Sequence, residues 1–260
     1  MHEFNDEVEQ LAEEILAYAL ERLKSDPPLD GPQSPEELLA KAGNTITTNG
    51  LGGEKTLKLF REVLAKACIS TDHPRYLAFI PSAPSEYSSL FDLVVGATAV
   101  YGGSWLEGAG AVFAENQALR WIADLAGLPK EAGGVFVQGG TLGNLSALVV
   151  AREYERIANK NVVEWVIACN KYAHSSIKAS AMVMDALVLQ VEPGADGVMR
   201  GEDLDEAISE YELKNPTHKI FAVVATAGST NLGIIDDLES CGKVAERRDI
   251  WFHVDGAYGL

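Results

Sequence analysis

Apolar and charged positions alternate with a helical period through the first part of the chain, residues 3–24. Leu11, Ile15 and Tyr18 recur three or four residues apart among charged side chains, so they share one face of a helix. The stretch that follows, SDPPLDGPQSP at 25–35, carries four prolines and interrupts this pattern. We therefore predict an amphipathic helix over 3–24.

Two further helices are expected before the first strand. Ser34, Pro35 and the two glutamates after them combine a capping side chain, a first-turn proline and negative charge, all of which favour a helix start. A third helix is predicted over 55–68, and no strand pattern occurs in this part of the chain. We predict that 1–78 forms an N-terminal helical segment.

The pattern changes from about residue 79. Helices are predicted over 85–100 and 109–125, and short apolar runs then alternate with helical patterns. The predicted strands are 134–138, 163–169, 186–191, 219–228 and 249–255, and the helices between them are 143–158, 175–185, 202–213 and 236–247. Uniformly apolar strands separated by helices are typical of a parallel sheet covered on both faces. We predict an α/β domain over 79–260, with ligands bound at the carboxyl ends of its strands.

Composition narrows the choice of partners and compartment. The chain has 260 residues and a formal net charge of −17, which argues against nucleic acid and anionic membranes as partners. Its three cysteines are widely spaced and form no C-x-x-C motif, so neither a disulfide framework nor a zinc site is expected. The first ten residues are acidic, unlike a secretory signal, and the longest apolar run is too short to span a bilayer. We expect a cytoplasmic protein without membrane insertion.

A glycine-rich turn follows the predicted strand 134–138. In this run, GGTLGN at 139–144, Gly140, Thr141 and Leu142 precede a helix whose free N–H groups suit a phosphate. An ordinary strand-to-helix turn would have the same composition, and the run is neither G-x-G-x-x-G nor a P-loop. Phosphate binding is therefore one of two interpretations that this turn leaves open.

Three other strand ends carry polar residues. His174 follows 163–169, where a serine after it could cap the next helix, and Thr226 lies in a small polar run at the end of 219–228. Asp255 closes the last apolar strand, where an acid needs a cationic or hydrogen-bonding partner. A metal site made of His253 and Asp255, or a Ser-His-Asp hydrolase, is disfavoured because no second ligand cluster and no G-x-S-x-G motif occurs.

One ligand would account for all four strand ends together. Its phosphate would bind the turn at 140–142, its flat ring would stack on His174, and Asp255 would pair with a basic ring nitrogen. Ala257 is small enough to let the other ring face approach. A ligand with these features is pyridoxal 5′-phosphate, and we expect no metal.

The motifs resemble those of the group II pyridoxal-phosphate-dependent amino-acid decarboxylases, which include the aromatic-L-amino-acid, histidine and glutamate decarboxylases. The similarity runs in the family's order from about residue 5 to the last residue, and the aromatic branch looks nearest. The matching stretches are HPRY (73–76), FIPS (79–82), GSW (103–105), VQGGTLGNLSALVVAR (137–152), YAHSSIKASA (172–181), VVATAGSTNLGIIDDL (223–238) and DIWFHVDGAYG (249–259).

The resemblance implies a fold type I pyridoxal-phosphate enzyme that decarboxylates an L-amino acid to an amine and CO2. It implies that the turn at 140–142 binds the cofactor phosphate, that Thr226 contacts the cofactor, and that Ala257 lies beneath its ring. It also implies catalytic roles for His174, which stacks on the ring, and for Asp255, which pairs with the ring nitrogen.

The same resemblance implies a substrate pocket. Ser82 matches a position near the substrate carboxylate, and Ile80, Tyr101 and Gly103 fall where the side-chain pocket is lined. Gly103 replaces a bulkier residue common in the aromatic branch, which leaves the exact amino acid open. The family forms homodimers, and the helix at 3–24 resembles the segment that packs on the partner.

The family's Schiff-base lysine lies several tens of residues after the aspartate, and no lysine follows Asp255 here. We expect that the 260 residues are an incomplete amino-terminal portion and that this portion alone is inactive. Two alternatives remain open. One is another fold type I enzyme acting on amino acids, and the other is a non-catalytic binding chain.

Overall fold

The computed structural model describes residues 4–78, 85–160 and 162–259. The chain divides into two compact units, Met1–Tyr101 and Gly102–Leu260, which are treated separately below. The predicted domain boundary at 78/79 adjoins residues outside the described ranges and stays a prediction. None of the helices within the described ranges combines the length and the apolar character needed to cross a bilayer.

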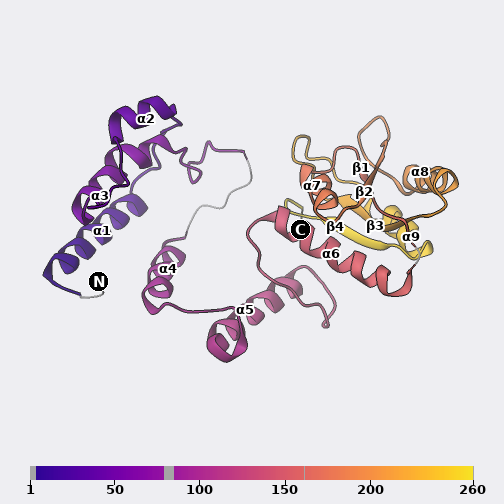
Figure 1. The fold of residues 1–260 in the computed structure, drawn as a ribbon, viewed down its shortest axis with the longest axis horizontal. Helices are drawn as coiled ribbons and strands as arrows, with labels where there is room; N and C mark the ends of the chain where they lie inside the picture. The colour runs from indigo at the N-terminus through magenta and orange to yellow at the C-terminus, as the bar shows by residue number, and fades with distance from the viewer. Residues whose placement is uncertain (1–3, 79–84, 161, 260) are drawn as a thin grey trace. The chain divides into compact units, whose positions relative to one another are not determined.

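The N-terminal unit is helical, as its pattern predicts (Figure 1). The Asn5 side chain accepts a hydrogen bond from the Val8 N–H at 3.0 Å, and Ser34 and Glu37 form a reciprocal capping box, so both helix starts are fixed locally. The predicted helix over 55–68 continues beyond α3 as a π turn and a short 3₁₀ turn. The elements are α1 (Asp6–Lys24), α2 (Pro35–Ala42), α3 (Gly53–Leu59), the π turn (Phe60–Leu64), the 3₁₀ turn (Ala65–Ala67) and α4 (Glu86–Thr98).

An apolar groove of about 1150 Å³ runs between the helices of this unit. Tyr18 from α1 meets Phe60 edge to face, with ring centroids 6.2 Å apart, yet Phe60 and Ile15 keep 47% and 46% of their surface exposed. Arg22 and Asp72 close one part of its lining through an ion pair of 2.7 Å. Exposed apolar surface of this extent is typical of a protein interface.

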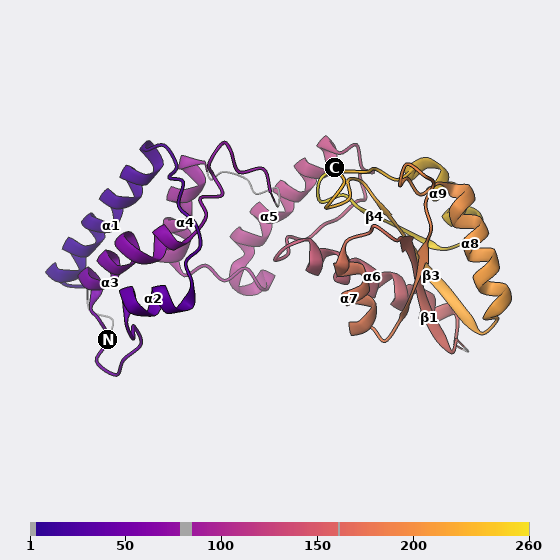
Figure 2. The ribbon, with the colours of Figure 1, turned by 90° about the horizontal axis from the view of Figure 1, so that it is seen from above.

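The second unit contains a four-stranded parallel sheet with strand order β2-β1-β3-β4. Figure 2 shows α6 and α7 against one face of the sheet and α8 and α9 against the other. The predicted α/β fold with a parallel sheet covered on both faces is therefore confirmed. The elements of this unit are α5 (Trp105–Leu125), α6 (Gly140–Ala158), β1 (Glu164–Asn170), α7 (Ser175–Val183), β2 (Leu187–Val191), α8 (Gly201–Lys214), β3 (His218–Thr226), α9 (Leu238–Arg247) and β4 (Trp251–Asp255).

Alternate residues of the central strands point into two separate cores. In β1, Val166 and Ala168 pack among the residues of α8 and α9, whereas Ile167 and Cys169 pack among those of α6 and α7. All four are at most 3% exposed. The register between β1 and β3 shifts by one residue at Phe221, which makes a bulge there. The apolar strands read from the pattern are thus buried on both faces.

The segment 134–138 is not a strand, which corrects the prediction for that run. It forms no ladder with β1–β4, and Val135 and Phe136 are 66% and 56% exposed. The Phe136 N–H points instead toward the Glu115 carboxylate, at 3.4 Å. An apolar run becomes a strand only where a neighbouring strand satisfies its backbone, and the described residues place none beside it.

Helix α6 begins at Gly140, three residues before its predicted start. Gly139 is the N-cap with φ of +89°, a conformation that other residues rarely adopt, and it lets the chain turn directly into the helix. The run GGTLGN therefore forms the first turn of α6.

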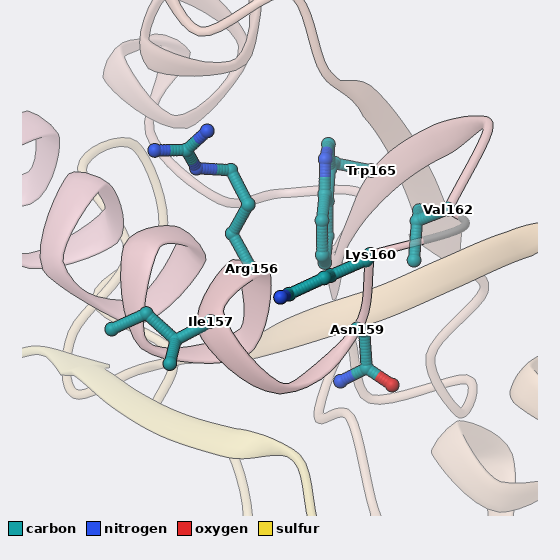
Figure 3. A pocket seen from close by; sticks show the side chains of 6 residues that line it. All are labelled: Arg156, Ile157, Asn159, Lys160, Val162 and Trp165. Carbon is teal, nitrogen blue, oxygen red and sulfur yellow. The ribbon is translucent and has the colours of Figure 1, made fainter.

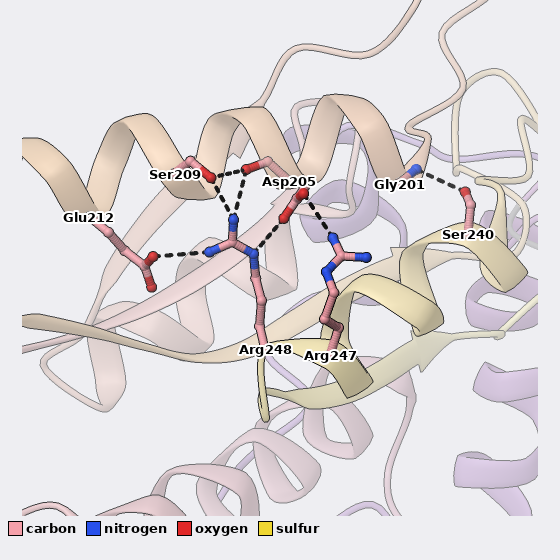
Figure 4. A network of polar contacts seen from close by, with 7 residues as sticks. All are labelled: Gly201, Asp205, Ser209, Glu212, Ser240, Arg247 and Arg248. Carbon is pink, nitrogen blue, oxygen red and sulfur yellow. Dashed lines mark hydrogen bonds and ion pairs between the residues drawn. The ribbon is translucent and has the colours of Figure 1, made fainter.

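On the far face of the sheet, Arg248 ties the end of α9 to α8 (Figure 4). Its guanidinium donates to the side chains of Asp205, Ser209 and Glu212, and Arg247 makes a second ion pair with Asp205 at 2.8 Å. These bonds lower the pKa of the Asp205 carboxyl. This network joins α8 to α9, the two helices that pack on one face of the sheet.

Candidate functional site

The carboxyl ends of β3 and β4 bring the predicted polar residues together. Thr226 and Asp255, the last residues of these strands, are register partners. Helix α6 packs across both strands, and a Cβ atom added to Gly140 at its start would lie 3.9 Å from the Cβ atom of Ala257. The glycine-rich turn, Thr226, Asp255 and Ala257 thus meet at one edge of the sheet.

The first turn of α6 offers free backbone donors. No side chain caps this helix, and among the described residues no acceptor is found for the N–H groups of Gly140 and Thr141. The N–H group of Leu142 bonds the Gly139 carbonyl at 3.1 Å. Free N–H groups at the positive end of a 19-residue helix suit an anion such as a phosphate.

His174 lies at the start of α7 with its side chain exposed to solvent. It is itself the N-cap: its Nδ1 accepts the Ser176 N–H at 3.2 Å, which corrects the prediction that Ser175 or Ser176 would cap this helix. Nδ1 also lies 2.9 Å from the Ser176 hydroxyl. A histidine anchored through one ring nitrogen keeps its ring plane fixed while a face stays open.

A buried asparagine, Asn144 of α6, links the two predicted catalytic residues. Its Nδ2 lies 3.1 Å from Asp255 Oδ2 and 3.0 Å from Ser176 Oγ, and Ser176 in turn contacts His174. Its Oδ1 lies 2.8 Å from His253 Nε2. His174 and Asp255 are therefore connected through three successive hydrogen bonds.

This arrangement bears on the two interpretations that the sequence disfavours, a metal site and a Ser-His-Asp hydrolase. His253 and Asp255 both bind the Asn144 amide, and the described part of the chain contains no group of three or more side chains suited to a metal ion. Ser176, the hydroxyl beside His174, is 2% exposed and therefore inaccessible as a nucleophile. Burial lowers the pKa of His253, which favours the neutral ring.

Thr226 carries a hydroxyl without a partner. Its Oγ1 is buried, and no hydrogen-bonding atom of the described residues reaches it. A buried hydroxyl without a hydrogen-bond partner destabilises the fold, unless a bound ligand supplies the missing partner. Together with the free N–H groups of the turn, the open face of His174 and the carboxylate of Asp255, it fits a ligand that carries a phosphate and a polar heteroaromatic ring.

Asp236 supports Thr226 from behind the site. This carboxylate is 3% exposed and accepts hydrogen bonds from Asn170 Nδ2 at 2.7 Å, the Met199 N–H at 3.0 Å and the Thr226 N–H at 2.9 Å. It therefore joins the ends of β1 and β3. Sequence reasoning missed Asp236, along with Asn144 and Ser176. The motif matches contained all three, but nothing in their spacing marks them as site residues.

The structure does not test the predicted substrate-pocket residues. Ile80 and Ser82 lie outside the described residues. Tyr101 belongs to the first unit and Gly103 to the second, and both are exposed. Their roles remain predictions.

A hollow lies at the C-terminal end of the 19-residue helix α6, whereas the glycine-rich turn forms its N-terminal end (Figure 3). Arg156 is already paired with Glu153 at 2.8 Å. Trp165 is the second residue of β1, at the end of the strand opposite to the candidate site. The hollow shares no residue with the candidate site. Its lining consists of Arg156, Ile157, Asn159, Lys160, Val162 and Trp165.

Comparison with known proteins gives matches along nearly the whole chain. The family model described as the pyridoxal-dependent decarboxylase conserved domain matches residues 35–259. The chain is 28% identical over 260 residues to an aromatic-L-amino-acid decarboxylase of Bacillus atrophaeus, covering 98% of this chain and 53% of that protein. It is 32% identical over 192 residues to an L-2,4-diaminobutyrate decarboxylase of Rhizobium meliloti (strain 1021), covering 72% and 38%.

The fold is similar to that of a solved structure from Vibrio parahaemolyticus, the glutamate decarboxylase domain of diaminobutyrate-pyruvate transaminase and L-2,4-diaminobutyrate decarboxylase. The TM-score is 0.85 at 26% identity, covering 100% of this chain and 60% of the other. The chain spans about half the length, or less, of the curated relatives it matches.

Proposed function

Because the chain belongs to the pyridoxal-dependent decarboxylase family, we propose that the whole protein decarboxylates an L-amino acid at the carboxyl ends of β3 and β4. The observation that carries this proposal is the convergence of Asp255, Thr226, the start of α6 and His174 on one edge of the sheet. These residues offer a carboxylate, a buried hydroxyl, free N–H groups and an open aromatic ring. The match of the family model to residues 35–259 confirms the motif resemblance at the level of the family.

The family's cofactor, pyridoxal phosphate, supplies when bound an electron sink for the electron pair left on Cα when CO2 departs. In our proposal the free N–H groups of Gly140 and Thr141 bind its phosphate, beside the Leu142 N–H that bonds the Gly139 carbonyl. Asp255 keeps a proton on its ring nitrogen, because a carboxylate beside a basic nitrogen favours the charged form.

Three further contacts complete the proposed cofactor site. His174 covers one face of the ring, Ala257 leaves room at the other, and the Thr226 hydroxyl gains the partner that it lacks. The ring would thus be held in a fixed plane, so that the bond to the carboxylate can be set perpendicular to it.

We propose an aromatic amino acid as the substrate. The match over 98% of the chain to an aromatic-L-amino-acid decarboxylase supports this choice, and the match to an L-2,4-diaminobutyrate decarboxylase makes a basic substrate the competing outcome. Gly103, the predicted pocket residue, would leave space for a large side chain.

Product analysis tests this function. The protein at its full natural length, supplied with pyridoxal phosphate, should release CO2 and the matching amine from tryptophan, tyrosine or dopa, and less from 2,4-diaminobutyrate or glutamate. Asp255→Asn should retain cofactor and lose most turnover, because a neutral amide cannot hold the ring-nitrogen proton. Near-normal turnover in that variant would remove the role proposed for Asp255, and absence of CO2 release from any amino acid would refute the function.

We also propose that the protein is a homodimer whose N-terminal helices pack on the partner. The apolar groove of the first unit supports this, since Ile15 and Phe60 are nearly half exposed there. Sedimentation velocity should give a dimer for the natural protein and a monomer for Ile15→Glu. Glu14→Lys, which changes an exposed charge on the same helix, should remain a dimer. A monomer in the natural protein would contradict the proposal.

A further inference from the structure

We propose that Asn144 is a positioning residue that holds Asp255 in the orientation in which it meets the cofactor's ring nitrogen, and that His253 in turn orients Asn144. Both roles rest on the proposed cofactor site. The proposal is based on the buried Asn144 amide, which has three hydrogen-bonding neighbours: Asp255 and His253 on β4 and Ser176 on α7.

The direction of each bond around Asn144 follows from proton counting. A carboxylate only accepts, so the atom facing Asp255 at 3.1 Å is the amide nitrogen. The second hydrogen of that nitrogen points to Ser176 Oγ at 3.0 Å. The amide oxygen must then face His253 Nε2 at 2.8 Å, and only a donor can satisfy it, so His253 carries its proton on Nε2.

The His253 N–H donor fixes the orientation of the Asn144 amide. If Asn144 rotated by half a turn, its oxygen would face the Asp255 carboxylate and its nitrogen would face an N–H group, leaving two like contacts in a site where the asparagine is 6% exposed. His253 lies two residues before Asp255 on β4, on the same face of the strand. Strand β4 therefore supplies both Asp255 and His253, the residue that orients Asn144.

A second branch leads from Asn144 to His174. Ser176 Oγ accepts from the amide, so its own hydrogen is free for His174 Nδ1 at 2.9 Å, which also accepts the Ser176 N–H. This places the His174 proton on Nε2. No hydrogen bond joins Ser176 to Asp255 among the described residues, so loss of the Ser176 hydroxyl should affect ring stacking and leave the carboxylate in place.

The two branches predict different ligand-binding behaviour. Two probes separate them: pyridoxal phosphate itself and its carbocyclic analogue, in which C–H replaces the ring nitrogen. The natural chain should bind pyridoxal phosphate about tenfold more tightly than the analogue, because only the cofactor makes the charge-assisted bond to Asp255. Both affinities are measured by equilibrium dialysis, and circular dichroism checks that each variant is folded.

Asn144→Leu, which keeps the size of the side chain, should reduce this tenfold preference to about twofold or less. His253→Leu should do the same, whereas His253→Gln, which keeps an N–H donor, should restore the preference. Ser176→Ala should weaken both ligands equally and keep the preference. Its matched control is Ser180→Ala on the same helix: Ser180 is also 2% exposed but has no hydrogen-bond partner among the described residues, and its loss should change neither affinity.

The result that overturns the positioning roles is an Asn144→Leu chain that is folded and binds both ligands more weakly but still prefers the cofactor tenfold. That outcome would mean that Asn144 only packs the phosphate turn. A natural chain that binds pyridoxal phosphate and its analogue equally well, or binds neither, would instead refute the proposed contact of Asp255 or the cofactor site itself.

Discussion

Replacing Asp236 by alanine should cost more stability than any other single carboxylate removal near the site. Three buried donors converge on this carboxylate, from Asn170, Met199 and Thr226, and each of these residues is at most 4% exposed. A buried donor left without an acceptor costs about 1–3 kcal/mol, while removing the buried charge returns part of its desolvation cost. We expect the free energy of unfolding to fall by about 4 kcal/mol.

The chain contains a matched control one residue away. Asp237 is exposed and caps α9 by accepting the Ser240 N–H at 3.1 Å, so Asp237→Ala should cost about 1 kcal/mol. Because a loss of 4 kcal/mol is a large share of a typical domain's stability, Asp236→Asn serves as a milder variant. The asparagine keeps Oδ1 as the acceptor for the Asn170 side chain and the Met199 N–H. Its NH2 group would face the Thr226 N–H, so one hydrogen bond is lost and two donors oppose each other, which should cost about 2 kcal/mol.

Urea unfolding followed by far-ultraviolet circular dichroism measures these differences as midpoint shifts at constant slope. The expected order of loss is Asp236→Ala, then Asp236→Asn, then Asp237→Ala. Equal losses at positions 236 and 237 would refute the reasoning, since they would show that the three converging hydrogen bonds contribute nothing beyond an exposed helix cap.

Three further outcomes follow from local packing and burial. Gly201→Ala should cost about 1–3 kcal/mol in the same assay, because its Cβ atom would lie 2.6 Å from the Ser240 carbonyl oxygen, whereas Gly110→Ala, in open space on α5, should gain about 0.5–1 kcal/mol. The exposed Cys68 should react with an aromatic disulfide reagent in the native chain, whereas the buried Cys169 and Cys241 should not. Burial also raises the pKa of Cys169 to about 12, which disfavours its reactive thiolate. Labelling of all three cysteines before unfolding would contradict this prediction. Burial lowers the pKa of His253, so below the ordinary histidine value of about 6.5 the unfolded chain binds a proton that the native ring does not, and stability falls as the pH falls. His253→Gln should show a smaller loss of urea midpoint between neutral pH and one unit below that value, and an identical loss would refute this assignment.

The architecture of the second unit was readable from the sequence because burial on both faces makes each parallel strand a continuous apolar run. β1 and β4 lie within two residues of their predicted limits for this reason. The run at 134–138 has the same composition, but no strand of the described residues pairs with it, and composition alone cannot say whether a partner strand is present. The early start of α6 depends on the backbone of Gly139, which one-dimensional periodicity does not report.

The candidate site was readable only where residues lie at the end of an apolar run or shortly after it. His174 and Asp255 stand out because a polar group near the end of an apolar run is unfavourable there unless it has a partner or a ligand. Asn144 and Ser176 lie within helices, where a polar residue is ordinary, and their importance comes from the packing of α6 against α7 and β4. Asp236 and Asp237 are indistinguishable as a sequence pair, and only the fold buries one of them.

The bulge in β3 shows how a feature invisible in the sequence determines the site. Ile220 packs toward α8 and α9, so strict alternation would turn Thr226 toward the same helices, away from Asn144. At the bulge Phe221 and Ala222 both pack toward α6 and α7, and the alternation that follows reverses. Val224 therefore packs toward α6 and α7, and Thr226, two residues later, falls on the same face beside Asp255. Without that one extra residue in β3, the unpartnered Thr226 hydroxyl would face α8 and α9, where the proposed cofactor does not bind.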